Sequence, residues 1–573
     1  MKRFIIAGGV AAGATAAARL RRLDEEAQII LVEKGSNISY ANCGLPYYIG
    51  AEIENRKNLF VATKKSMERK YNIDVREYSE VIEIDPKLKT AAIVDRKTGE
   101  KNIEEYTALL LATGSAPVVP PIPGVDGSNV FTVWTVSDSD RIKDFITRNK
   151  AKTSVIVGGG FIGLEMAENL KNLGMNVHIA EMLPHVMNPL DPDMSKLVEN
   201  HLRDKGVSLH LGNGISSIED NGRVAVLSDG SRIECDFIIM SAGIKPNNEI
   251  AKKLNLNMDN RGLVVTDECM RTNIDGIYAA GDLVTIKDIV TGEKHGVPLA
   301  GPANKEGRIA ADNMYFDSME NEVHKREKIR LSKMKDADKR YRYTGSQGTS
   351  IARIFDLSVA STGINEKQLK AAGKEYMKDY ACSLVKPMSH AGYYPGAEQM
   401  IIKLLFSLEN GKILGAQIIG GEGVDKRIDV IATALRLGAD VYELTQLELA
   451  YAPPYSSAKD PVNIAGYAAT NILDGLSDAL TWEIALNETE DKDNVLLDVR
   501  EDFETTAFGV EKAKHIPLPQ LRSRLGELDK EKTYYITCAV GLRGYIAERI
   551  MKQSGFRVKN ILGGMSTYRE LIK

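Results

Sequence analysis

Residues 153–181 have the sequence TSVIVGGGFIGLEMAENLKNLGMNVHIAE, and this stretch decides the fold. An apolar run suits a buried strand, a glycine-rich turn follows, and the next stretch has helical composition. Gly158, Gly160 and Gly163 fit the G-x-G-x-x-G spacing, in which glycine lets the backbone approach a pyrophosphate at the positive end of a helix. Glu181 ends the next strand, where a carboxylate binds a ribose 2′-hydroxyl and repels a 2′-phosphate. The segment predicts an NADH site, with NADPH as the weaker alternative.

A second unit of strand, turn, helix and strand occupies residues 2–33. Gly8 and Gly13 stand at the first and last glycine positions, whereas Val10 occupies the middle one. Glu33 again ends a strand, about twenty residues after the turn, as an acid of a nucleotide site should. Because two complete units are far more informative than one, we predict two dinucleotide sites.

The remaining segments predict an α/β protein with two interleaved Rossmann-like domains, a separate α+β domain and a small C-terminal α/β domain. Within the first domain, residues 317–343 are densely charged and are expected to form a solvated insertion. The expected limits are residues 1–150 and 265–343 for the first nucleotide domain, 151–264 for the second, 344–470 for the α+β domain and 478–573 for the last.

Composition excludes several classes of partner. The net charge is −4 with 27% charged residues, which gives no bulk attraction to nucleic acid or to an anionic membrane. The chain shows no signal-peptide pattern and no run of roughly 18 apolar residues, so a cytoplasmic protein is expected. Its five cysteines are scattered without a CxxC pair, which predicts neither a metal site nor a disulfide framework.

Several motifs occur in the order found in a known family. They are GGVAAG at 8–13, SYANCGLPY at 39–47, LLLATGS at 109–115, GGGFIGLE at 158–165 and YAAGD at 278–282. The chain resembles the FAD-containing pyridine nucleotide-disulfide oxidoreductases, in particular coenzyme A-disulfide reductase fused to a rhodanese domain, also described as CoA-persulfide or NADH-dependent persulfide reductase. The resemblance implies that the first unit binds FAD, that Asp282 contacts the ribityl or phosphate part of the flavin, that residues 344–470 form a dimerisation domain, and that the enzyme is a homodimer.

Cys43 lacks the second cysteine that usual members of the superfamily have about five residues away, since the next one is Cys235. Its redox partner must therefore be an external thiol or its own sulfenic form. The motif Ser39-Tyr40-x-Asn42-Cys43-Gly44 resembles the single-cysteine coenzyme A-disulfide reductases. A helix starting just after Cys43 would stabilise the reactive thiolate. The cysteines at 235, 269 and 382 have no activating neighbours and are expected to be buried apolar side chains.

The resemblance implies a cycle in which NADH reduces FAD and the flavin reduces a mixed disulfide between Cys43 and CoA. The freed thiolate then attacks the next CoA persulfide, CoA disulfide or polysulfide. By position, Tyr393 and Tyr451 would reach Cys43 of the opposite subunit and donate a proton or a hydrogen bond to the leaving sulfur. Aromatic packing at a dimer interface is the alternative role of both tyrosines. The CoA contacts implied by position are Thr15, Arg19, Arg22, Ser39, Asn42, Asn304 and Lys459.

The sequence from Cys538 to Gly544 (CAVGLRG) follows a strand, precedes a helix and resembles a rhodanese active loop, with Gly541 and Arg543 inside it. Such a loop turns backbone N–H groups toward the sulfur, so Cys538 would accept sulfane sulfur. Asp498, Arg500 and His515 resemble other signatures of that domain.

Two other functions compete with the reductase. One is an NADH oxidase or peroxidase that uses a sulfenic acid at Cys43. Val10 makes the peroxidase less favourable, because related peroxidases place a histidine in this turn. The other is a redox-sensing, sulfur-delivery protein in which the flavin only reports the redox state.

Overall fold

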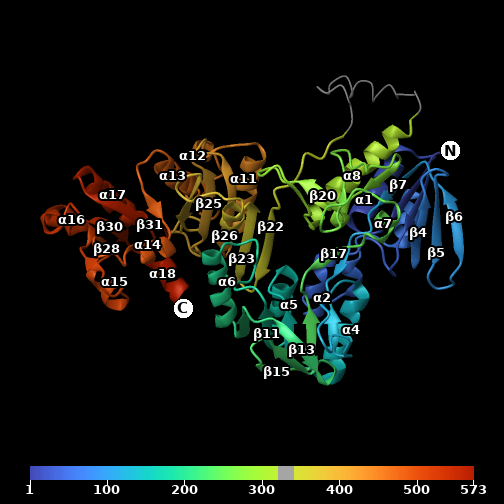
Figure 1. Ribbon diagram of the computed structural model, residues 1–573, viewed down its shortest axis with the longest axis horizontal. Coiled ribbons are helices and arrows are strands. Elements are labelled where there is room, and N and C mark those ends of the chain that lie inside the picture. Colours follow the sequence, from blue (N-terminus) through green and yellow to red (C-terminus); the bar gives the residue numbers. More distant parts are fainter. Residues whose placement is uncertain (320–340) are drawn as a thin grey trace. The chain divides into compact units, whose positions relative to one another are not determined.

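The computed structural model describes residues 1–319 and 341–573, which form two compact units (Figure 1). Unit 1 comprises residues 1–184 and 207–348, and unit 2 comprises residues 185–206 and 349–573. Most of the expected charged insertion, residues 320–340, lies outside the described residues. None of the described helices is long and apolar enough to cross a lipid bilayer.

The first sheet of unit 1 is parallel and has the order β19-β7-β1-β2-β3. Its central strands are buried on both faces, as expected for parallel strands covered by helices. Strand β19 comes from far along the chain, so the domain is discontinuous. The elements are β1 (Arg3–Ala7), α1 (Ala11–Leu23), β2 (Gln28–Val32), β3 (Asp74–Arg76), β7 (Ala108–Leu111), β19 (Ile277–Ala279) and α8 (Ala300–Asp317), of which α1 and α8 pack together.

The second sheet of unit 1 is also parallel, with the order β12-β11-β10-β16-β9. It includes β9, which precedes residue 151, where the second nucleotide domain was expected to begin. The rings of Phe131, Phe145 and Phe237 pack edge to face and join α4 to this sheet. The elements are β9 (Val130–Thr132), α4 (Val136–Asn149), β10 (Thr153–Val157), α5 (Phe161–Asn172), β11 (Asn176–Glu181), β12 (Val207–Leu211) and β16 (Phe237–Met240).

Smaller elements complete unit 1. Two antiparallel three-stranded sheets, a mixed three-stranded sheet (β18-β20-β21) and a short strand pair complete the sheets described in this unit. The strands are β4 (Ser79–Asp85), β5 (Thr90–Asp95), β6 (Lys101–Glu105), β8 (Ser115–Pro117), β13 (Ile215–Glu219), β14 (Val224–Leu227), β15 (Arg232–Glu234), β17 (Ile244–Pro246), β18 (Val264–Val265), β20 (Val284–Lys287) and β21 (Lys294–His295). The helices are α2 (Leu45–Ile49), α3 (Lys64–Tyr71) and α7 (Glu249–Lys253).

The first sheet of unit 2 is antiparallel and has the order β22-β23-β26-β25-β24. Helix α11 packs against β23 and β26, and α13 packs against β24 and β25. The elements are α6 (Pro192–Asp204), β22 (Ser350–Ile354), β23 (Leu357–Gly363), α10 (Glu366–Ala371), β24 (Tyr380–Val385), β25 (Ile401–Ser407), β26 (Ile413–Gly420), α11 (Val424–Arg436), α12 (Val441–Gln446) and α13 (Pro461–Leu473).

The C-terminal module of unit 2 is a parallel sheet of order β27-β31-β30-β28-β29 with two separate apolar clusters. Its last helix contacts α6, where the Asn200 side chain donates to the backbone oxygen of Glu570 at 2.8 Å. The predicted α/β fold class is confirmed. The elements are β27 (Ala479–Leu480), α14 (Trp482–Glu488), β28 (Asn494–Asp498), α15 (Asp502–Ala507), β29 (Lys514–His515), α16 (Leu518–Arg524), β30 (Thr533–Thr537), α17 (Leu542–Gln553), β31 (Arg557–Ile561) and α18 (Gly564–Ile572).

Candidate functional site

The first glycine turn lies between β1 and α1. Gly8 has φ +110°, and a Cβ atom there would come within 2.0 Å of the Ala112 backbone oxygen, so only glycine fits. No side chain caps α1 after Val10. The carboxylate of Glu33 accepts hydrogen bonds from the backbone N–H groups of Gly9 (2.8 Å) and Gly35 (2.7 Å). The turn thus presents a helix start to an anion beside a fixed acid, which fits a dinucleotide.

The second glycine turn, between β10 and α5, repeats this geometry. A Cβ atom on Gly160 would meet nothing within 4 Å, so this face of the turn is open to a ligand. Gly163 packs α5 so closely that its Cβ would lie 2.0 Å from the Gly158 backbone oxygen. Glu181 accepts from the backbone N–H groups of Gly159 (2.6 Å) and Leu183 (2.7 Å). The predicted glycines and acid therefore meet at one place, with room for a pyrophosphate.

Asp282 lies in a 3-10 turn after β19. Its carboxylate accepts a hydrogen bond from the hydroxyl of Ser115 at 2.7 Å, and burial raises its pKa. Next to it, the backbone N–H of Gly281 donates to Glu306 at 2.7 Å. Burial, with a smaller contribution from Asp282, raises the pKa of Glu306 to about 7. Glu306 was missed by sequence reasoning, because nothing in the helical sequence around it signals that its side chain is buried.

Cys43 lies in a 3-10 turn (Asn42–Gly44), and α2 begins two residues later at Leu45. Its side chain is exposed in the single chain. Its pKa is nevertheless raised, first by partial desolvation and then by the negative charges of Glu165 and Asp282. A backbone hydrogen bond at Cys43 lowers the pKa, as expected beside a helix start, but partial desolvation and the two carboxylates outweigh it in the single chain.

Glu165 is a second residue that sequence reasoning missed, although it stands inside the GGGFIGLE motif. It lies on the first turns of α5, and burial together with the charge of Glu168 raises its pKa to about 7. Its charge acts on Cys43, so it faces the thiol from the second nucleotide turn. A carboxyl group with such a pKa can gain or lose a proton near neutral pH.

Ser39 fixes the thiol segment to the first nucleotide turn. Its backbone is left-handed, with φ +46°, a conformation that serine rarely adopts. Its N–H donates to the backbone oxygen of Gly9 at 2.9 Å, and its own oxygen accepts from Val61 at 2.9 Å. Asn42, at the start of the next turn, is exposed. The segment is thus held rigidly against the glycine turn while Asn42 and Cys43 face outward.

The other predicted CoA contacts of unit 1 lie on α1 and α8. The Thr15 hydroxyl donates to the Asn304 side-chain oxygen at 2.5 Å, so these two predicted residues meet. Arg19 is held by Asp312 at 2.7 Å, whereas Arg22 is exposed. Arg22 is thus available to a phosphate, and Arg19 already has a carboxylate partner. Lys459 belongs to unit 2, where it is exposed.

Tyr393 and Tyr451 meet on unit 2. Their hydroxyl groups are 3.0 Å apart, although 58 residues separate them in sequence. Both side chains are exposed, at 76% and 49%. Their hydrogen bond raises the pKa of Tyr393. Two exposed phenols joined in this way do not pack a core within the single chain, which favours a role at a surface.

Cys538 follows β30 and is 1% exposed. The N–H of Gly541 points at its sulfur, with N···Sγ 3.1 Å, and Gly541 immediately precedes α17. A Cβ atom on Gly544 would come 3.7 Å from the sulfur, so the helix start lies close beside it. The side chain of Arg543 pairs with Glu504 at 2.6 Å. The sequence predicts a loop whose backbone N–H groups turn toward the sulfur, and the N–H of Gly541 has this direction.

The remaining signature residues of this module have structural partners. The guanidinium of Arg500 donates to the Asp498 carboxylate at 2.6 Å and to the backbone oxygen of Phe508 at 2.7 Å. The ring of His515 contacts the backbone oxygen of Arg500 at 2.7 Å. These groups fix the loop after β28, which places Glu504 beside the Cys538 loop.

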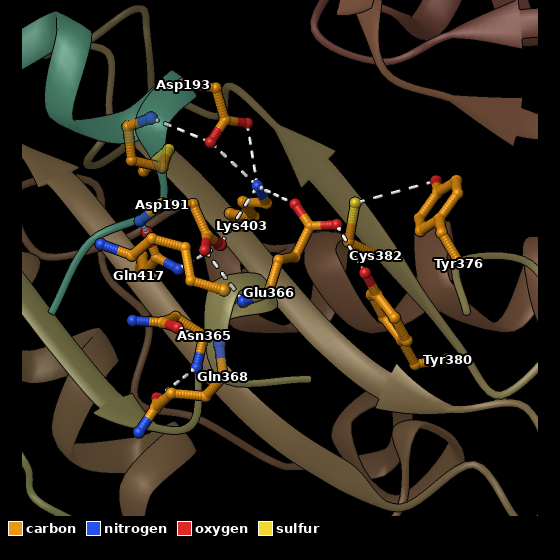
Figure 2. A network of polar contacts seen from close by, with 12 residues as sticks. Asp191, Asp193, Asn365, Glu366, Gln368, Tyr376, Tyr380, Cys382, Lys403 and Gln417 are labelled. Atoms are coloured by element: carbon orange, nitrogen blue, oxygen red, sulfur yellow. Dashed lines mark hydrogen bonds and ion pairs between the residues drawn. The ribbon is translucent and has the colours of Figure 1, made fainter. Parts of the chain in front are cut away.

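The other cysteines are buried, as expected. Burial raises the pKa of Cys235 to about 12. Cys382 lies 3.8 Å from the Tyr376 hydroxyl, beside the ammonium group of Lys403, which is 1% exposed (Figure 2). This buried network, with no counterpart in the sequence analysis, also contains three carboxylates around Lys403, those of Asp191 (3.2 Å), Asp193 (2.9 Å) and Glu366 (2.5 Å).

Two nucleotide turns, a thiol beside the first turn and a second thiol in an anion-binding loop define a two-nucleotide thiol oxidoreductase. The chain belongs to the pyridine nucleotide-disulphide oxidoreductase family, whose main domain matches residues 2–307. The dimerisation domain of that family matches residues 349–461, and a rhodanese-like domain matches residues 481–571.

Named relatives and solved structures agree with this assignment. The coenzyme A disulfide reductase of Staphylococcus haemolyticus is 33% identical over 82% of this chain and 100% of its own length, and an NADH oxidase of Methanocaldococcus jannaschii is 33% identical over 82% and 99%. A crystal structure of reduced Bacillus anthracis CoADR-RHD matches with TM-score 0.93 and 43% identity, covering 100% of this chain and 98% of that one. An NAD-dependent persulfide reductase from A. fulgidus matches with TM-score 0.88 and 37% identity, over 99% and 100%.

The enzyme uses FAD and NADH. Its two turns suit these groups, because each presents an uncapped helix start and a carboxylate at the end of the following strand. FAD would lie on the Gly8 turn near Asp282, and NADH on the Gly158 turn near Glu181.

Proposed function

We propose that this enzyme reduces CoA persulfide and CoA disulfide with NADH, through a mixed disulfide between Cys43 and CoA. One observation carries the proposal: a single exposed cysteine lies beside two dinucleotide turns, in a chain that also contains an anion-binding cysteine loop. A solitary thiol needs a thiol substrate as its partner. Polysulfide is a further substrate of the same chemistry, because it presents a sulfur–sulfur bond to the same nucleophile.

Different residues of the chain have different roles in this reaction. FAD, when bound, passes the two electrons of NADH to the sulfur site. Cys43 then attacks the CoA-bound sulfur of a CoA persulfide or one sulfur of a CoA disulfide. The mixed disulfide with CoA forms, and hydrosulfide or CoA thiolate leaves with the bonding electron pair. Thr15 and Asn304 fix the N-terminal part of α1, and the exposed Arg22 binds a phosphate of CoA. Glu165 takes up or releases the proton of the thiol near neutral pH.

Cys538 is proposed to accept sulfane sulfur as a persulfide and to exchange it with CoA. Its sulfur receives a backbone N–H from Gly541, which suits a negatively charged persulfide. The flexible pantetheine arm of CoA would carry the sulfur between Cys538 and Cys43. The protein is proposed to act in the cytoplasm as a homodimer, in which Tyr393 and Tyr451 donate to the sulfur at Cys43 of the partner.

Substrate assays test the proposal directly. The purified FAD-loaded enzyme should oxidise NADH steadily with CoA persulfide or CoA disulfide, and it should release sulfide or CoA. Steady turnover with oxygen or peroxide instead would establish the competing oxidase or peroxidase function. NADPH should give a lower kcat/KM than NADH because of Glu181.

Subunit exchange tests the tyrosine assignment. A Cys43→Ser chain mixed with a Tyr451→Phe chain should recover activity that neither homodimer has, since one intact site forms per heterodimer. Failure to recover activity after verified exchange would place both residues in the same chain's site.

A further inference from the structure

The Cys538 loop contains a single cationic side chain, and that side chain is already paired. Arg543 donates to the two carboxylate oxygens of Glu504 at 2.6 and 2.7 Å. The two side chains are partly buried, at 29% and 20% exposure. A bidentate pair of this kind occupies the edge of the guanidinium that would otherwise bind an oxyanion.

A second carboxylate acts on the guanidinium of Arg543. Glu501 stands at the start of α15, and its negative charge acts on Arg543 together with that of Glu504. The N–H donors of Arg500 are not available to a ligand, because they are directed at Asp498 and at backbone oxygens. Among the described charges that act on Arg543, two carboxylates thus oppose one guanidinium.

Apolar side chains are exposed next to this ion pair. Leu542, which begins α17, is 67% exposed, and Ile546 lies one helical turn further on the same face at 37%. Phe503, the neighbour of Glu504 on α15, is 74% exposed. An apolar and slightly acidic entrance suits an uncharged organic arm and repels small anions.

We propose that Glu504 is a specificity-determining residue, which makes the Cys538 loop accept persulfide sulfur from an uncharged arm such as pantetheine and disfavour dianionic donors such as thiosulfate. This inference rests on the proposed role of Cys538 as a sulfur acceptor. With either donor the Cys538 thiolate attacks the outer sulfur, the bond from that sulfur to the donor breaks, and the donor leaves with the electron pair, as CoA thiolate or as sulfite. Neither transfer changes the total number of electrons, so no further oxidant or reductant is needed.

The two donors differ in where their charge lies. Thiosulfate brings two negative charges to the loop, and sulfite leaves from the same place. The phosphates of CoA lie at the far end of a long arm. Glu504 neutralises the cation that would hold thiosulfate, whereas it leaves the transfer from CoA persulfide unaffected.

Donor competition in the full-length, FAD-loaded enzyme tests the proposal. A Cys43→Ser background prevents turnover, and mass spectrometry measures the persulfide on Cys538 while sulfite or CoA release is followed. Glu504→Gln should speed loading from thiosulfate by roughly five- to tenfold, a gain that shrinks with salt. Loading from CoA persulfide should change by less than about twofold. Glu504→Asp, which keeps the charge, should retain the selectivity.

Glu531→Gln is the matched control. Glu531 also pairs with an arginine, Arg557, at 3.4 Å, but it precedes β30 whereas Cys538 follows that strand. The control removes the same charge at the other end of the strand and should leave the ratio of donor rates unchanged. Adding Arg543→Gln to Glu504→Gln should abolish the thiosulfate gain.

Three results would overturn the inference. An unchanged donor ratio in a folded Glu504→Gln protein would exclude a selective role. An equal loss with both donors would mean that the ion pair merely supports the loop. If no donor loads Cys538 in the enzyme with an unmodified loop, the proposed sulfur-acceptor role itself is disproved. This result differs from the first two, which refute only the role of Glu504.

Discussion

Cys43 and Cys538 are the two sulfur centres of the proposed cycle, and the protein surrounds them in opposite ways. Cys43 is exposed in the single chain, and its charged neighbours, Glu165 and Asp282, are acidic. Cys538 is 1% exposed, receives a backbone N–H and faces a guanidinium. At the accessible thiol the acidic neighbours outweigh a backbone hydrogen bond, whereas the buried thiol has a backbone N–H directed at its sulfur.

This difference suits the two species that the cysteines would hold. A mixed disulfide at Cys43 has no charge on sulfur, so acidic neighbours do not destabilise it, whereas they disfavour the free thiolate. A persulfide at Cys538 is an anion and needs donors directed at it. We infer that the site of Cys43 favours its disulfide form and that the backbone N–H of Gly541 suits a persulfide bound at Cys538.

The largest expected effect separates the two thiols. Cys43→Ser should lower NADH-dependent reduction of CoA disulfide and CoA persulfide by roughly a thousandfold or more, while FAD stays bound and is still reduced by NADH. Cys538→Ser should retain reduction of preformed CoA persulfide but lose sulfur uptake by the loop. Both variants are compared by NADH consumption and sulfide release. If Cys538→Ser matches the unmodified enzyme with every sulfane donor, Cys538 is not a sulfur acceptor.

An intermediate effect concerns the backbone donor at Cys538. Gly541 has φ +116°, and a Cβ there would meet no atom closer than 3.8 Å, so Gly541→Ala strains the backbone without a clash. Turning its N–H away from the sulfur should slow persulfide loading by about ten- to a hundredfold. Gly555→Ala is the control, since Gly555 also has positive φ but follows α17 at its far end. Both variants should lose about 1–2 kcal/mol of unfolding free energy, and equal loading rates would refute the role of the donor.

The sequence alone predicted the features that are built from residues adjacent in the chain. A strand, a glycine turn and a helix are neighbours in the chain, so the amino-acid order alone is enough to assign Gly158 and Glu181 to a nucleotide site. The loop around Cys538 was predicted for the same reason. The resemblance to a family supplied the roles of Tyr393 and Tyr451, but not the hydrogen bond between them.

What sequence reasoning missed depends on long-range packing. The raised pKa of Glu165 follows from burial, which a single acid in a helix does not reveal. Lys403 is neutralised by carboxylates from segments about 40 to 210 residues away, and the pairing of Arg543 with Glu504 spans 39 residues. Such contacts exist only after the sheets have assembled. The acidic neighbours of Cys43 were missed for the same reason, since Glu165 and Asp282 come from other segments of the chain.

The smallest expected effect tests the acidic surroundings of Cys43. Glu165→Gln removes a negative charge that raises the pKa of the thiol, so the thiolate fraction and the alkylation rate of the reduced, CoA-free holoenzyme should rise about two- to fivefold near pH 8. Because the pKa of Glu165 is itself about 7, the carboxyl is already neutral at pH 6, and the two proteins should then react alike. Glu54→Gln, at an exposed position, should change nothing. A rate increase of the same size at pH 6 and pH 8 would show that the substitution opens access to Cys43 rather than altering its charge.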